Sequence, residues 1–136
     1  MNIRNVVIHK QTQLTPTSCV PCCIAMVTGV DQQSIIDEMA MHYDSSGSMR
    51  SEFRQWVRMG YLPRALPYGD LQPGQLMLAT VPSLNIEAGN HRIIIDWLGD
   101  EPIVHDPNEG REGRKVYTYH KLRGWSELTV VEWCRS

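Results

Sequence analysis

The sequence predicts an α+β fold in which N-terminal helices pack on a C-terminal antiparallel sheet. Two observations lead to this expectation. Apolar residues recur with helical spacing up to residue 59, whereas β-branched and aromatic residues gather in short runs after residue 75. Helices that precede the strands, rather than alternate with them, are typical of α+β domains. A length of 136 residues suits one domain, and we expect 1–136 to form it.

The first two helices are expected over 19–29 and from 32 to about 41. The first is almost wholly apolar, Ser18 or Cys19 can cap it, and Gly29 suits its C-terminal end. Asp31 can cap the second helix, which would bury one apolar face. That face consists of Ile35, Ile36 and Met39.

A third helix is expected over 49–59, with Ser48 as its cap and Gly60 as its stop. Its apolar stripe comprises Met49, Phe53, Trp56 and Val57. The following segment, 61–74, holds three prolines and several other turn residues, which predicts an irregular crossover into the second half. Arginines at four-residue spacing in the third helix indicate a solvated face.

Five segments are predicted to be strands because they are rich in β-branched and aromatic residues. These segments are 75–81, 91–98, 102–105, 115–119 and 127–133. Gly99-Asp100 predicts a tight hairpin turn between the second and third of them, and 106–110 predicts another turn.

Composition and charge exclude several classes of function. Apolar residues make up 42% of the chain, the formal net charge is −2 and the sequence pI is about 6.2. Binding to nucleic acid or to an anionic membrane needs a basic face, so we expect neither. The chain lacks a run of 18 apolar residues and a signal-peptide core, so we expect no membrane insertion and a cytoplasmic location.

Three of the four cysteines are clustered, and the cluster includes a candidate nucleophile. Cys19, Cys22 and Cys23 lie within five residues, and Cys134 lies near the end of the sequence. Cys19 would begin the first helix, where the helix dipole and free N–H groups favour a thiolate. Cys22 and Cys23 fall inside the apolar helix and are expected to pack in the core, as Cys19 itself could.

A nucleophilic cysteine needs a base, and the base needs an orienting group. His91 opens one predicted strand and Asp106 follows the next. With a two-residue turn at Gly99-Asp100, Asp106 lies opposite Ile93, so His91 and Asp106 form a diagonal pair on one face. His105 points to the other face. Gln13, six residues before Cys19, could donate to an oxyanion together with the Cys19 N–H.

These motifs together resemble the papain-like cysteine peptidases that remove double-glycine leaders from bacteriocin precursors. The matching pieces are Gln13-x5-Cys19, Cys23-Ile24-Ala25-Met26, the run from Gly89 to Ile95, the run from Val104 to Gly110, and Trp125. The resemblance covers nearly the whole chain and implies the papain-like fold. It implies catalysis by Cys19, His91, Asp106 and Gln13 on a peptide or protein substrate, with no cofactor and no metal.

The chain departs from this family at the nucleophile, where Ser18-Cys19-Val20 replaces the usual Asp-Cys-Gly. Several alternatives therefore stay open. Relatives of this fold include glutamine deamidases with the same triad, and a catalytically silent chain could bind a peptide. Cys19 and Cys22 with Cys134 and a histidine could bind zinc, or Cys19-x2-Cys22 could be a redox motif.

Overall fold

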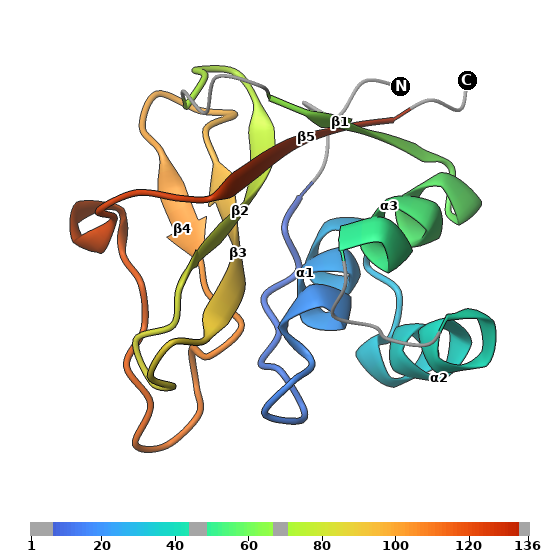
Figure 1. Ribbon diagram of the computed structural model, residues 1–136. Coiled ribbons are helices and arrows are strands. Elements are labelled where there is room, and N and C mark those ends of the chain that lie inside the picture. Colours follow the sequence, from blue (N-terminus) through green and yellow to red (C-terminus); the bar gives the residue numbers. More distant parts are fainter. Residues whose placement is uncertain (1–6, 44–48, 67–70, 134–136) are drawn as a thin grey trace.

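Three helices precede a five-stranded antiparallel sheet along the chain, as the sequence predicts (Figure 1). The computed structural model describes residues 7–43, 49–66 and 71–133. The helices are α1 (Cys19–Thr28), α2 (Gln32–His42), α3 (Met49–Arg58) and a short 3-10 helix, η2 (Tyr119–Lys121). The strands are β1 (Tyr61–Ala65), β2 (Leu76–Pro82), β3 (Asn90–Asp96), β4 (Ile103–His105) and β5 (Glu127–Trp133). None of the helices in these described ranges is long and apolar enough to cross a membrane.

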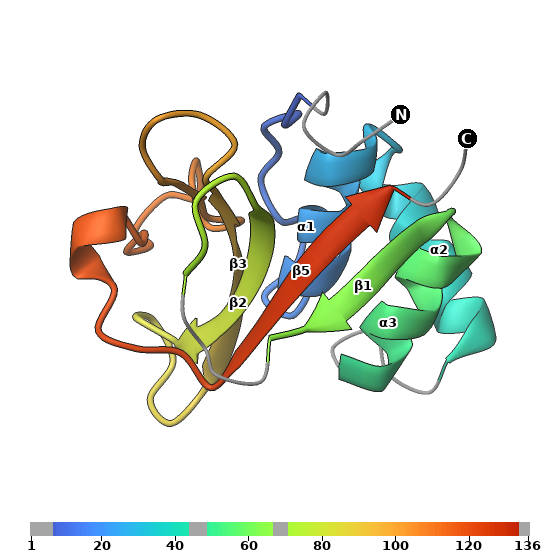
Figure 2. The ribbon, with the colours of Figure 1, turned by 90° about the horizontal axis from the view of Figure 1, so that it is seen from above.

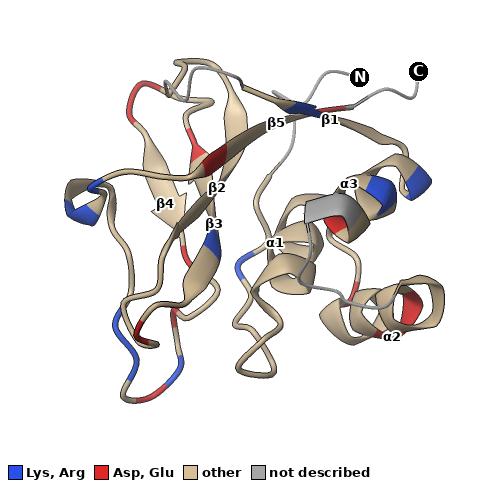
Figure 3. Ribbon diagram, viewed as in Figure 1, with Lys and Arg blue, Asp and Glu red and all other residues tan. Residues whose placement is uncertain are grey.

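Helix α1 is buried along most of its length and carries no charged residue (Figure 3). It ends where predicted, because Gly29 adopts a left-handed conformation with φ 75° and donates its N–H to Ala25 O at 2.8 Å. The prediction that the Ser18 side chain can cap this helix is wrong. Ser18 occupies the N-cap position, but its hydroxyl accepts the Thr15 N–H instead of a helix N–H. The first turn of α1 therefore has no side-chain cap.

Helix α3 does not bury the stripe that its apolar residues predict. Trp56 is buried as expected, but Val57 is 61% exposed. Glu52 and Gln55 are buried instead. This polar face points inward because the Glu52 carboxylate forms an ion pair with Arg92 inside the molecule. Ser48 and the side chain of Met49 lie outside the described residues.

The sheet has the strand order β1-β5-β2-β3-β4, and every neighbouring pair is antiparallel. Strand β5 joins two parts of it: its first residues pair with β2 and its last residues pair with β1 (Figure 2). Strand β1 lies within the segment predicted as an irregular crossover. Its Pro63 argued against a strand, and it is tolerated because β1 is an edge strand.

The hairpin of β3 and β4 has the register that the sequence predicts, with Ile94 opposite His105 and Asp96 opposite Ile103. Its connecting segment, 97–102, is longer than the predicted two-residue turn, yet the register is unchanged. The predicted strand at 115–119 is wrong. The backbone there leaves the sheet, and Tyr117 donates its N–H to the Asp106 carboxylate.

Both faces of the sheet are covered, which explains why β2 and β3 are apolar without alternation. One face packs on the helices, with Leu78 and Ile94 against α1 residues such as Ile24. The other face, with Ile93 and Ile95, packs against the long segment between β4 and β5. Figure 1 shows the helices and this long segment on opposite sides of the sheet.

Candidate active site

Cys19 is held at the first turn of α1, next to the beginning of β3. One turn further along α1, Cys23 lies against this strand, with its Sγ 3.4 Å from Arg92 O. Cys19 is on the same side of the helix, since residues four apart share a face. The side chains of Cys19 and His91 line the same pocket and interact electrostatically. The half-buried Cys19 thiol therefore meets the imidazole at the place where helix and sheet touch.

His91 is bound on its other side by Asp106. The distance from His91 Nε2 to Asp106 Oδ1 is 2.6 Å, and both side chains are almost fully buried. A carboxylate accepts hydrogen bonds, so this contact places a ring proton on Nε2 and leaves Nδ1 for the thiol. The diagonal arrangement of His91 and Asp106 is the one that the predicted register produces.

Two residues that sequence reasoning missed hold Asp106 in place. Asn108 donates its backbone N–H to Asp106 Oδ1 at 2.8 Å, and Tyr117 donates its N–H to Oδ2 at 2.7 Å. The Asn108 side-chain nitrogen also lies 3.4 Å from His91 Nε2. The Asp-Pro-Asn sequence could have indicated the first contact, because aspartate commonly bonds the N–H two residues on. No local sequence feature indicates that the Tyr117 N–H bonds Asp106.

The electrostatics of the site favour a protonated His91. Burial by itself would lower the pKa of this ring, but the hydrogen bonds to Asp106 and Cys19 and the charges of both groups outweigh it. Together these interactions raise the pKa of His91 from 6.5 to about 9. At neutral pH the imidazole is therefore an imidazolium, the state that stabilises a neighbouring thiolate.

Cys22 and Cys23 have the opposite environment and behave as core residues, as predicted. Both are fully buried. Burial, together with the charges of Cys19 and Asp106, raises the pKa of the Cys22 thiol to about 12. Burial raises the pKa of Cys23 well above the ordinary value as well. Cys134 lies outside the described residues.

Gln13 is buried near the nucleophile end of α1 but is not bonded to Cys19 in the described structure. Its Nε2 donates to Thr15 O at 2.8 Å, and its backbone N–H donates to Pro107 O at 2.8 Å. Its Oε1 is buried without a hydrogen-bond partner among the described residues. The amide nitrogen has two hydrogens, and the bond to Thr15 uses one of them.

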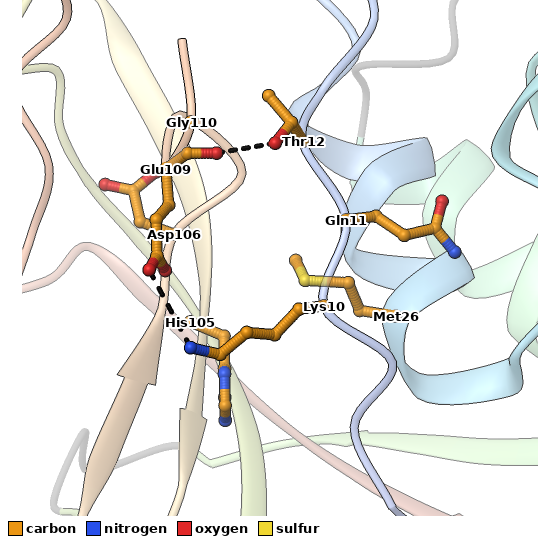
Figure 4. Close-up of a pocket in the computed structure, with 8 residues that line it drawn as sticks. All are labelled: Lys10, Gln11, Thr12, Met26, His105, Asp106, Glu109 and Gly110. Carbon is orange, nitrogen blue, oxygen red and sulfur yellow. Dashed lines mark hydrogen bonds and ion pairs between the residues drawn. The ribbon is translucent and has the colours of Figure 1, made fainter.

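Residues 10–12, which precede α1, contact the turn that follows Asp106 (Figure 4). Thr12 Oγ1 donates to Glu109 O at 2.6 Å, and Lys10 Nζ lies 3.7 Å from a Glu109 carboxylate oxygen. A pocket of about 240 Å³ lies between this segment and β4. Its lining includes Asp106 but neither Cys19 nor His91, so this pocket is separate from the one that holds the reactive pair.

A second pocket, of about 180 Å³, opens in front of the reactive pair and includes both Cys19 and His91. Its inner wall holds a buried ion pair in which Arg92 Nη2 lies 3.1 Å from Glu52 Oε2. Desolvation raises the pKa of Glu52, while the charge and hydrogen bonds of Arg92 act in the opposite direction. An arginine inside the apolar strand 91–98 was the available sequence signal for this pair.

Within 7–43, 49–66 and 71–133, no group of three or more His, Cys, Asp and Glu residues is arranged to hold a metal ion. Cys19 and Cys22 are free thiols. Arg58 lies 3.6 Å from Glu38 on a solvated helix face, in agreement with the interpretation of the arginine series.

Comparisons with protein-family models and with curated proteins give no match. Solved structures do give matches. One is a double-glycine motif protease from an AMS/PCAT transporter in complex with the leader peptide, with a TM-score of 0.63, 11% identity and coverage of 93% of this chain and 92% of that chain. Another is the peptidase domain of Streptococcus ComA, a bi-functional ABC transporter of a quorum sensing pathway, with a TM-score of 0.63, 12% identity and coverage of 92% and 97%.

This likeness extends over nearly the full length of both chains and confirms the predicted fold. The chain has the α+β architecture of these peptidase domains, with helices first and an antiparallel sheet after them. At 11–12% identity the likeness concerns the fold, and the chemistry has to be argued from the residues of this chain.

Proposed function

We propose that residues 1–136 form a cysteine hydrolase that cleaves peptide or protein amide bonds. The observation that carries this proposal is the chain of contacts from Cys19 to His91 to Asp106 at the edge of a pocket. A nucleophile bonded to a base that is oriented by a third group is the arrangement needed for covalent catalysis. The likeness to peptidase domains supports the same conclusion. The clustered cysteines favour a reducing compartment such as the cytoplasm.

In the proposed reaction the Cys19 thiolate attacks the substrate carbonyl carbon, and the carbonyl π electrons move to oxygen. The oxyanion accepts one hydrogen bond from the backbone N–H of Cys19, because no side chain caps the first turn of α1. It accepts another from the amide hydrogen of Gln13 that does not bond Thr15. His91 then gives its proton to the leaving amine, and the C–N bond breaks to leave a thioester. His91 next takes a proton from water, whose oxygen attacks the thioester carbon. The C–S bond then breaks, which releases the carboxylic acid and restores the Cys19 thiolate beside protonated His91. Asp106 keeps the ring oriented throughout.

Glutamine deamidation uses the same steps on a side-chain amide, and intact mass separates the two reactions. Proteolysis divides the substrate into fragments, whereas deamidation keeps one chain and replaces an amide NH2 by OH. We expect fragments, because the solved structures that share this fold are peptidase domains. A mass change without fragments would show that the deamidase alternative is correct.

Cys19 should react with iodoacetamide at neutral pH faster than any other cysteine of the chain. It is half-buried and lines one pocket with His91, whereas Cys22 and Cys23 are fully buried with raised pKa values. Mass mapping after brief exposure measures the four rates, and His91→Gln should slow the labelling of Cys19 alone. Equal rates, or faster labelling of Cys22, would favour the redox alternative.

Stability should fall with rising pH because of His91. Its pKa is about 9 in the folded chain against 6.5 for an ordinary histidine. The protonated ring therefore stabilises the fold in full below pH 6.5, and this contribution is lost as the pH rises through about 9. Urea unfolding across this interval should show the wild type losing stability relative to His91→Gln. A constant difference between the two proteins would contradict the assignment.

A further inference from the structure

The pocket in front of Cys19 holds two carboxylates and one guanidinium beside the reactive pair of Cys19 and His91. Besides Cys19 and His91, it is lined by Arg92 and by two carboxylates, those of Glu52 and Glu127. Glu127 is the first residue of β5, which brings an acidic side chain across the sheet to the start of β3. Figure 3 shows acidic segments on β5 and a basic segment on β3. One guanidinium thus faces two carboxylates.

Arg92 is already committed to partners inside the protein. Its guanidinium donates to Glu52 Oε1 at 3.2 Å, Thr80 Oγ1 at 2.9 Å and Thr129 Oγ1 at 3.0 Å. Glu52 accepts from Arg92 at both oxygens and from Trp56 Nε1 at Oε1, so it acts only as an acceptor, as an ionised carboxylate does. These two side chains neutralise each other within the wall.

Glu127 has no comparable cation. Its side chain is exposed, and its hydrogen bond among the described residues is from Thr80 Oγ1 at 3.4 Å. The ion pairs within the described residues do not include Glu127. Within the pocket wall, Glu127 is therefore a carboxylate that no ion pair among the described residues neutralises.

The geometry points to a binding pocket for a basic side chain next to the scissile bond, with Glu127 as the specificity-determining residue. This inference rests on the proposed function. A pocket of about 180 Å³ has room for a lysine or arginine side chain, which a glycine would leave empty. The cationic end would meet the Glu127 carboxylate, and the exposed Asn90 side chain at the rim offers a further acceptor. An acidic side chain would be repelled.

The test uses peptidyl ketone warheads that differ only in one residue beside the ketone or one position before it: arginine, norleucine, glutamate or glycine. The rate at which the full-length protein is labelled at Cys19 is read by mass mapping. We expect the arginine warhead to label about tenfold faster than the norleucine warhead in at least one position, as for a hydrogen bond between charged groups. Added salt should reduce this preference because it screens an exposed carboxylate.

Glu127→Gln should reduce the ratio of arginine to norleucine labelling to about one, and Glu127→Lys should favour glutamate instead. Glu101→Gln is the matched control, because Glu101 is exposed beyond the opposite end of β3 and should keep the ratio. Equal labelling by all four warheads would overturn the pocket proposal and leave the hydrolase intact. Failure of every warhead to label Cys19 would overturn the proposed function, and the pocket proposal with it.

Discussion

Replacing Cys19 with alanine should abolish peptide cleavage while the fold stays intact. The sulfur is the atom that forms the bond to substrate in the proposed reaction, and no other described cysteine can replace it, since Cys22 and Cys23 are fully buried. Loss of the nucleophile of a triad lowers kcat by about 10⁴-fold or more. The measurement is kcat/KM on a peptide that the wild type cleaves, with circular dichroism and thermal unfolding to check the fold.

Asp106→Asn provides the graded comparison for this result. Asp106 does not touch the substrate; it orients His91 through a 2.6 Å contact, so its amide variant should retain part of the activity. Cys22→Ala is the matched control, because Cys22 is a core thiol bonded to Gln11 O, and its loss should affect stability more than turnover. Full activity in Cys19→Ala would show that another residue is the nucleophile.

The register of one hairpin is what made the His91–Asp106 pair predictable from sequence. Apolar strands on either side of Gly99-Asp100 fix which residues face each other, and register survives a change in loop length because each strand must keep its buried face. The position of Cys19 at the beginning of α1 was predictable for a similar reason, since a helix start can be identified from local residues alone.

The rest of the site depends on contacts between distant segments, and the local sequence does not identify the partners in these contacts. Glu52 and Arg92 are forty residues apart; an arginine within an apolar strand indicates a buried charge, but nothing local identifies Glu52 as its partner. The hydrophobic pattern of α3 therefore predicted the wrong face, because a buried ion pair outweighed the apolar Val57. Tyr117 was placed in a strand by its β propensity, whereas its N–H is used by Asp106.

The buried pair between Glu52 and Arg92 should give the largest stability effect in the molecule. Both side chains are almost fully buried, and Arg92 bonds Glu52, Thr80 and Thr129 together across α3, β2, β3 and β5. Removing one partner leaves an unpaired charge in the interior. Arg92→Met or Glu52→Gln should therefore lower the free energy of unfolding by about 3–5 kcal/mol, measured by urea unfolding.

The exposed pair between Arg64 and Glu132 supplies the matched comparison, because its nitrogen-to-oxygen distance is also 3.1 Å but its side chains are 52% and 42% exposed. Arg64→Met should cost less than about 1 kcal/mol. The double variant Glu52→Leu with Arg92→Met should recover much of the stability lost in either single variant, since it leaves no unpaired charge. If Arg92→Met costs no more than Arg64→Met, the buried pair does not hold α3 against the sheet. The rotation of α3 that buries Glu52 and exposes Val57 would then need another cause.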